Sequence, residues 1–294
     1  MSRVRVDAHA KVNLSLEVLR RRPDGFHEIR SVMQSIDLSD RLLVGPSDAL
    51  RLECDLQHLQ GEGNLVLRAA RALQEATQTR LGAEILLRKG IPVAAGLGGA
   101  SSDAAAVLVA LVRLWRLPLR RRDLVAMAAS LGSDVPFFLM GGTALVSSRG
   151  EQVTPLPDAP TRWVVLLAPP HSLAAKTAEL YRRLGPECWS SGERTARLAE
   201  VISRAGRLDQ GLLGNTFERV AERVFPDLAE HRRAMREAGA SDVHLSGSGP
   251  TLFSLFATEA EARAVAARLA AGRRRPMVAR TLTAAEAAPN PVEL

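Results

Sequence analysis

The segment Pro92-Val93-Ala94-Ala95-Gly96-Leu97-Gly98-Gly99-Ala100-Ser101-Ser102-Asp103 carries the strongest structural signal in the chain. It follows a strand candidate at residues 83–88 and opens into residues 102–115, whose Ala, Val and Leu content predicts a helix. Glycines let the backbone approach a ligand, and a helix N-terminus offers unpaired N–H groups. Ser101 and Ser102 add hydroxyls that can cap the helix or touch a phosphate. The alternative is a tight turn with a serine cap, but three glycines and two serines at one strand-to-helix junction favour a phosphate site.

Two common nucleotide motifs do not match this segment. The Walker pattern GxxxxGK[ST] is absent because no lysine follows the glycines. The dinucleotide fingerprint is absent as well, because the acidic residue expected about 20 positions later is missing. A second small-residue loop, Ser246-Gly247-Ser248-Gly249-Pro250-Thr251, lies between two strand candidates. Alone it is equally well explained as a flexible hairpin, but the two loops together favour a phosphate site between them.

The composition is that of an ordinary globular protein. The chain has 294 residues, of which 46% are hydrophobic and 24% charged. No apolar run approaches the roughly 18 uncharged residues of a membrane helix, and charged residues at positions 1–6 do not suit a signal peptide. Cys54 and Cys188 form no disulfide framework and no zinc pattern. We therefore expect a cytoplasmic enzyme with free thiols and no membrane partner.

The formal net charge of +7 indicates anionic partners. The densest arginine runs, at residues 20–22, 120–122 and 273–275, are short and far apart in the sequence. Aromatic residues make up only 4% of the chain and do not interleave with them. This pattern favours a solvated arginine-rich surface over a nucleic-acid footprint, and we expect no nucleic-acid partner.

Strands and helices are mixed irregularly along the chain, which favours an α+β fold over a doubly wound one. Alternating or apolar runs predict strands at 3–18, 29–43, 49–54, 83–88, 143–147, 163–167, 243–245, 252–256 and 277–282. Helices are predicted at 64–73, 102–115, 123–131, 177–184, 194–204, 215–224, 228–238 and 259–271. The proline-rich segment 154–160 is a candidate boundary. We predict one domain over 1–153, a second over 161–283 and a loose tail over 284–294.

Lys11 and Asp134 stand out among the charged residues. Lys11 lies in an extended apolar segment of a chain that has only three lysines among 39 basic residues, and lysine acts as a compact point charge. Asp134 lies in Leu131-Gly132-Ser133-Asp134-Val135-Pro136, after a predicted helix. Taken singly, each is better explained as a surface charge or a helix cap.

Four segments together resemble the signature motifs of the GHMP kinase superfamily. They are Ala10-Lys11-Val12-Asn13-Leu14, residues 96–103, Leu131-Gly132-Ser133-Asp134-Val135-Pro136-Phe137 and Ser246-Gly247-Ser248-Gly249. Within the superfamily, Pro23-Asp24-Gly25-Phe26-His27-Glu28 resembles a segment of the kinases that act on a cytidine-diphosphate-linked methylerythritol. The resemblance runs from about residue 8 to about residue 257, with the motifs in the same order and spacing.

This resemblance implies a two-domain GHMP kinase fold, with a ribosomal S5 domain 2-like N-terminal domain and an α/β-sandwich C-terminal domain. It implies transfer of a phosphoryl group from ATP, with Mg²⁺, to the 2-hydroxyl of that alcohol in the non-mevalonate isoprenoid pathway. Two rivals are another kinase of the superfamily, such as homoserine or mevalonate kinase, and a basic nucleic-acid-binding protein of similar α+β fold. The substrates of the rival kinases offer no base to stack on Phe26.

The resemblance also implies roles for individual residues. Asp134 is the general base for the substrate hydroxyl, and Lys11 orients it and offsets developing charge. Phe26 and Tyr181 stack on the cytosine, and His27 hydrogen-bonds to it. Other implied substrate-binding residues are Asn13, near the erythritol, with Gly247 and Ser248. The residues implied to bind ATP are Pro92, Ala94, Ala95, Gly96, Leu97, Gly98, Gly99, Ala100, Ser101 and Ser102.

Two further expectations concern the limits of this site. No residue is assigned as a metal ligand, because phosphates and water fill most of the magnesium shell. Residues 215–218 are given no role, because Thr216 stands where the family often has Asp.

Overall fold

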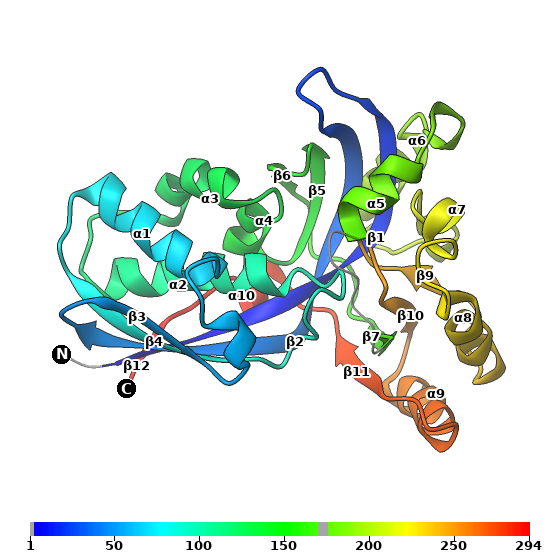
Figure 1. The fold of residues 1–294 in the computed structure, drawn as a ribbon. Coiled ribbons are helices and arrows are strands. Elements are labelled where there is room, and N and C mark those ends of the chain that lie inside the picture. The colour runs from blue at the N-terminus through cyan, green and yellow to red at the C-terminus, as the bar shows by residue number, and fades with distance from the viewer. Residues whose placement is uncertain (1–2, 170–175) are drawn as a thin grey trace.

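The computed structural model describes residues 3–169 and 176–294, and two β-sheets organise these residues (Figure 1). The first sheet has the order β12-β1-β2-β4-β3; in addition β5 pairs with β2, β6 pairs with β5 and β8 pairs with β1. The second sheet has the order β11-β7-β10-β9. Segment 156–162 connects β6 of the first sheet to β7 of the second, and the chain returns to the first sheet at β8 and β12. Among the helices of the described residues, none is long and apolar enough to cross a membrane.

The strands of the first sheet are β1 (Val4–Arg21), β2 (His27–Ser47), β3 (Leu50–Cys54), β4 (Gly82–Arg88), β5 (Thr143–Ser148), β6 (Gln152–Pro155), β8 (Gly214–Asn215) and β12 (Val292–Glu293). The helices of this half are α1 (Leu65–Thr77), α2 (Gly99–Leu114), α3 (Val125–Leu131), α4 (Val135–Met140) and α10 (Ala284–Ala287). The second half contains β7 (Trp163–Leu167), β9 (His244–Leu245), β10 (Leu252–Phe256), β11 (Pro276–Arg280), α5 (Lys176–Arg183), α6 (Glu193–Ala205), α7 (Glu218–Ala221), α8 (Leu228–Glu237) and α9 (Glu259–Ala271).

The long antiparallel hairpin of β1 and β2 runs through both halves of the molecule (Figure 1). Near its open end, the alternate residues Val4, Val6 and Ala8 are buried in the core of the first half. At its far end, Val18 and Ile29 pack in the core of the second half. One pair of strands therefore supplies apolar side chains to both cores, and burying them stabilises both halves.

A third apolar cluster joins the two halves. Val12 and Leu14 of β1 lie in the same cluster as Leu166 of β7 and Phe253 of β10. Helix α6 adds Leu198, Ala199 and Ile202 to this cluster, all of them buried. The middle of β1, which carries Lys11 and Asn13, is consequently held by packing from both halves.

The glycine loop, which we define as residues 90–98, connects β4 to α2. Most of helix α2 is buried, and its run of small residues lets it pack closely against β1 and β2. Earlier in the chain, Asn64 is the N-cap of α1, because its side chain accepts a hydrogen bond from Val66 N at 2.9 Å. The loop thus leaves the sheet at one end and enters a rigid helix at the other.

The predicted α+β class is confirmed, but two predicted segments are wrong. Residues 284–294 are not a loose tail: they form α10 and β12, and β12 pairs with β1 at Val4 and Arg5. The predicted helix at 215–224 is largely replaced by β8 and the short α7. There Thr216 N donates to Leu16 O at 2.8 Å, so pairing with β1 overrides the local helical pattern. Helix α4, directly after Asp134, was not predicted.

Candidate active site

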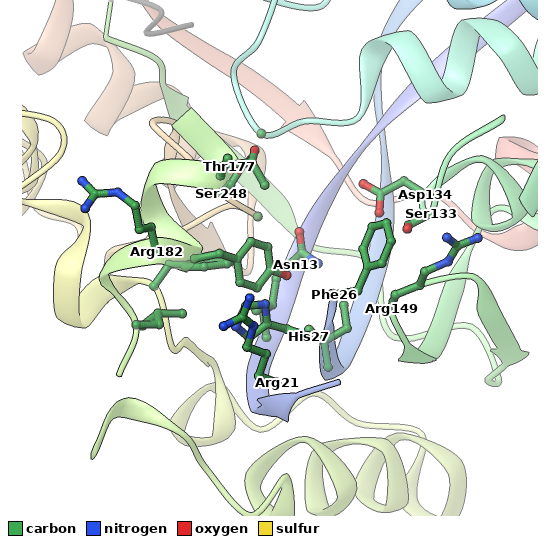
Figure 2. A pocket seen from close by; sticks show the side chains of 18 of the residues that line it. Asn13, Arg21, Phe26, His27, Ser133, Asp134, Arg149, Thr177, Arg182 and Ser248 are labelled. Atoms are coloured by element: carbon green, nitrogen blue, oxygen red, sulfur yellow. The ribbon is translucent and has the colours of Figure 1, made fainter. Parts of the chain in front are cut away.

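A large cavity of about 850 Å³ opens between the β1–β2 hairpin, the glycine loop, α5 and the loop at 246–249. We call it the large cavity. It contains every residue predicted to be catalytic or to bind the substrate. Its lining includes Lys11, Asn13, Phe26, His27, Asp134, Tyr181, Gly247 and Ser248. Figure 2 shows Phe26, Asp134 and Arg149 on one side of this space, and Thr177, Ser248 and Arg182 on the other.

Lys11 is buried at the floor of the large cavity. Its Nζ donates to Asn13 Oδ1 at 2.5 Å and to Gly96 O at 3.2 Å, and lies 3.6 Å from Asp134 Oδ2. Burial lowers the pKa of Lys11, and the nearby Asp134 carboxylate opposes this shift. The backbone also takes part, because Lys11 N donates to Leu97 O at 3.0 Å. Lys11 therefore joins the Asp134 carboxylate to the glycine loop.

Asp134 presents its carboxylate to the large cavity. The side chain is 32% exposed, whereas that of Lys11 is only 4% exposed. Asp134 lies at the N-cap of α4, whose following residues, Val135, Pro136 and Phe137, are buried. The packing of this helix anchors the backbone behind the carboxylate. A carboxylate that is open to a cavity and paired with a buried ammonium suits a general base for a bound hydroxyl.

Phe26 lies at the tip of the hairpin with half of its surface exposed. Its backbone N–H donates to Asp24 Oδ1 at 3.1 Å, and Arg22 Nε donates to Asp24 Oδ2 at 3.0 Å. Arg149 places its guanidinium 5.2 Å from the centre of the Phe26 ring, a cation–π distance. The tip is thus held in place while the ring remains available at the cavity edge.

His27 and Tyr181 form a stacked pair in the lining of the large cavity. Their ring centres are 4.5 Å apart, and the planes differ by 19°. The Tyr181 ring also meets Phe217 edge-on at 4.9 Å. Burial and the neighbouring Arg21 lower the pKa of His27, which keeps its ring neutral at pH 7 with one donor and one acceptor nitrogen. Such a group can read the edge of a planar base.

A second cavity, of about 660 Å³, lies along the glycine loop, and we call it the loop cavity. The predicted nucleotide-binding residues in its lining are Pro92, Ala94, Ala95, Gly96, Gly98, Gly99, Ala100 and Ser101. Leu97 and Ser102 are not in that lining. Leu97 is buried in the cluster between the two halves, and Ser102 Oγ donates to His9 O at 2.7 Å. These two side chains support the loop from behind.

The loop geometry requires glycine at two positions. Gly98 has φ of +78°, and a Cβ there would lie 2.4 Å from Phe138 Cζ. Gly96 has φ of +83°, and a Cβ would lie 2.4 Å from Ser246 O. The second small-residue loop is therefore in direct contact with the first one, and Ser246 Oγ donates to Gly96 O at 3.1 Å. Because Gly96, Gly98 and Thr177 line both cavities, the two cavities meet at the glycine loop.

Several residues of the site were not predicted from the sequence. Asn215 holds the second loop, because its Nδ2 donates to Leu245 O at 2.9 Å and to Gly247 O at 2.7 Å. Thr177 and Ser248 hydrogen-bond through their hydroxyls at 2.8 Å. Arg149 and Arg182 add positive charge to the large cavity. The sequence offered one signal for Asn215: its amide side chain stands at the start of the predicted helix at 215–224.

Two cavities that meet at a glycine-rich helix N-terminus, one of them with a Lys–Asp pair, define a phosphoryl-transfer enzyme. Comparison with known sequences specifies the class. The family described as "GHMP kinases N terminal domain" matches residues 64–142, and "GHMP kinases C terminal" matches residues 193–273. The chain belongs to the GHMP kinase family and is a kinase.

Three similar relatives carry the name 4-diphosphocytidyl-2-C-methyl-D-erythritol kinase. The relative from Dehalococcoides mccartyi is 48% identical over 250 residues, which cover 85% of this chain and 88% of the relative. The relative from Pelotomaculum thermopropionicum is 45% identical over 265 residues, which cover 89% and 92%. The relative from Geobacillus kaustophilus is 42% identical over 258 residues, which cover 86% and 88%.

Solved structures give the same classification. A crystal structure of 4-(cytidine 5'-diphospho)-2C-methyl-D-erythritol kinase superposes with a TM-score of 0.79 at 37% identity, over 94% of this chain and 98% of that one. A homoserine kinase from Cytophaga hutchinsonii gives a TM-score of 0.73 at 21% identity, over 99% of this chain and 98% of that one. The second likeness shows the shared fold alone.

Proposed function

We propose that this kinase transfers the γ-phosphoryl group of ATP to the 2-hydroxyl of 4-diphosphocytidyl-2-C-methyl-D-erythritol, in the non-mevalonate route to isoprenoid precursors. The observation that carries this proposal is the composition of the large cavity. It combines aromatic and imidazole groups suited to a base with the Lys11–Asp134 pair suited to an alcohol. The names of the relatives support the same substrate.

In the proposed complex, ATP occupies the loop cavity and the alcohol occupies the large cavity. N–H groups of the glycine loop and of the first turn of α2 face the phosphates, where the helix dipole also favours negative charge. The γ-phosphoryl group then reaches the junction of the cavities, near Lys11. Phosphoryl transfer needs mainly positioning and charge neutralisation, and these groups supply both.

The proposed proton acceptor is Asp134. As the substrate oxygen attacks the γ-phosphorus, its proton moves to a carboxylate oxygen of Asp134. The Lys11 ammonium, 3.6 Å from Asp134 Oδ2, offsets negative charge near the carboxylate. Asn13 holds Lys11 in place, and its own Nδ2 donates to Ser31 Oγ at 2.8 Å.

The base-binding part of the proposal involves three residues. Phe26 and Tyr181 offer ring faces to the cytosine, and His27 offers its ring nitrogens to the base edge. In the structure described here His27 stacks on Tyr181. Binding of the cytosine against that face of Tyr181 therefore requires the His27 ring to move aside.

We also propose that ATP acts with Mg²⁺. Among the described residues, no group of three or more His, Cys, Asp or Glu side chains could hold a metal ion. An ion that arrives on the ATP phosphates and keeps water in its shell needs few protein ligands. When bound, it neutralises charge on the phosphoryl oxygens. A cytoplasmic location, where ATP is available and the free thiols Cys54 and Cys188 stay reduced, belongs to the same proposal.

The proposal is tested by a coupled ADP-release assay with a panel of alcohols. We expect turnover with 4-diphosphocytidyl-2-C-methyl-D-erythritol and none with homoserine or mevalonate at the same concentration. Turnover of either of the latter without the cytidylyl substrate would refute the proposal. Filter binding to RNA over a salt series tests the remaining rival, because binding through many phosphates weakens steeply as salt rises.

A further inference from the structure

Three ionisable side chains form a buried cluster at the base of the glycine loop. The Lys89 ammonium donates to Asp40 Oδ2 and to Asp103 Oδ2, the latter at 2.6 Å. The side chains of Lys89, Asp40 and Asp103 are 6%, 0% and 4% exposed. Burying such groups costs free energy that apolar packing would avoid, so overall stability does not account for their presence.

The cluster joins three elements that surround the loop. Asp40 belongs to β2, Lys89 lies just after β4, and Asp103 lies near the start of α2. Asp40 Oδ1 also accepts hydrogen bonds from Gly90 N at 2.7 Å and Ile91 N at 2.8 Å. The first residues of the loop and the helix after it are therefore tied to the sheet at one point.

Lys89 is not available as a phosphate-binding charge, although it lines the loop cavity. Two carboxyl groups already hold its ammonium, and the cluster contains more acidic than basic groups. Asp103 Oδ1 is buried and has no hydrogen-bond partner among the described residues. Burial raises the pKa of Asp103 to about 8, against the opposing charge of Lys89. An oxygen without solvent or partner holds its proton more readily.

We propose that Lys89 and Asp103 are positioning residues for the nucleotide. The hydrogen bond between Lys89 and Asp103 joins the residue after β4 to the start of α2, and it thereby closes residues 89–103 into a ring. This ring fixes the direction of the backbone N–H groups that face the loop cavity. Donors that are aligned before the ligand arrives bind it without a cost of ordering the loop. This inference rests on the proposed binding of ATP in the loop cavity.

Two substitutions of Asp103 separate this role from the charge of the residue. Asp103→Leu replaces both oxygens by methyl groups on the same branched skeleton, so the Lys89 contact to α2 is lost. Asp103→Asn keeps a carbonyl oxygen that can accept from Lys89. We expect the Kd for ATP to rise about tenfold in Asp103→Leu, within the range for a charge-assisted hydrogen bond. We expect the Kd of Asp103→Asn to stay within about threefold of the wild type.

The measurements are titration calorimetry with ATP, the KM for the alcohol and the thermal unfolding midpoint. The alcohol KM should not change in either variant, because Asp103 does not line the large cavity. Glu17→Leu is the matched control: Glu17 is a buried carboxylate outside both cavities, which accepts from Thr195 N at 2.7 Å. It should lower the unfolding midpoint and leave the Kd for ATP unchanged.

Three results would overturn the proposal: wild-type ATP affinity in Asp103→Leu, an equal loss of affinity in Glu17→Leu, or an equal loss in Asp103→Asn. If Asp103→Leu does not fold, Asp103→Ser replaces it, because the short hydroxyl side chain does not reach Lys89. Wild-type enzyme is titrated in parallel. Wild type that binds no ATP refutes the proposed function itself, whereas tight binding by both wild type and Asp103→Leu refutes only the positioning role.

Discussion

Substitution of Asp134 by Asn is the sharpest test of the proposed chemistry. The change keeps the shape of the side chain and its place at the N-cap of α4, and it removes the basic oxygen. It also removes the partner charge of Lys11, which lies 3.6 Å away. At an effective dielectric constant of about 20, two unit charges at that separation attract by roughly 4 to 5 kcal/mol before the cost of desolvation.

Two effects on the rate follow from this geometry. Loss of a positioned general base lowers kcat by about 10² to 10⁴. Loss of the carboxylate charge lowers the pKa of Lys11 further, because burial already disfavours its ammonium and Asp134 is the group that opposes burial. Both effects act on the chemical step, so we expect the KM values for ATP and for the alcohol to change by less than about threefold.

The assay is steady-state ADP release at saturating ATP and alcohol, with thermal unfolding as the check on folding. Lys11→Met should also lower kcat. The double variant should lose less than the product of the two single losses, because the two residues act as a unit. A loss of only about tenfold in Asp134→Asn would assign the carboxylate to positioning rather than proton transfer. Full kcat in a folded Asp134→Asn enzyme would refute the general-base assignment.

Three further predictions concern the cavities and the buried cluster. Phe26→Ala should remove the roughly 1 to 3 kcal/mol of binding free energy that one stacked base contributes, so the KM for the cytidylyl substrate should rise while the KM for ATP stays unchanged. A selective loss of ATP affinity would contradict the placement of the base. Gly98→Val should abolish ATP binding in calorimetry and also lower the unfolding midpoint, because its Cβ would meet Phe138 at 2.4 Å; wild-type ATP affinity would remove the loop from the site. Because the folded chain holds the Asp103 proton more tightly than the unfolded chain, this group lowers the free energy of unfolding as pH rises from about 4 to about 8. Urea unfolding at several pH values should show this decline, and Asp103→Asn should reduce it; an unchanged pH dependence in Asp103→Asn would contradict the raised pKa.

The phosphate-binding loop could be predicted from the sequence because its residues are adjacent in the chain. The glycines and serines at 96–102 stand next to one another, and their junction with a helix gives a local reason for phosphate binding. Lys11 and Asp134 gave only weak local signals, because a single charged residue is usually a surface group. Their pairing at 3.6 Å exists only after β1 and α4 are packed together.

The parts that were missed depend on contacts between distant positions. Asp40, Lys89 and Asp103 form one cluster, but no local pattern in the sequence relates the three. Residues 292–293 are too few to show a strand pattern in the sequence. They form a strand because they pair with the edge of β1. The predicted helix at 215–224 failed for the same reason, since Asn215 and Thr216 bond to neighbours far away in sequence. Tertiary contacts override weak local preference at such places.

The position of β1 has a consequence for synthesis on the ribosome. β1 leaves the exit tunnel long before its neighbours β8 and β12, which are made only at residues 214–215 and 292–293. A nascent chain that ends at residue 200 already holds Lys11 and Asp134, yet it lacks the loop at 246–249 and part of the edge of its first sheet. Pairing between such distant segments is slow, because the intervening chain must first be ordered. The first sheet is therefore complete only after translation has reached β12, and Lys11 and Asp134, although made early, lack the loop at 246–249 until that loop has been made.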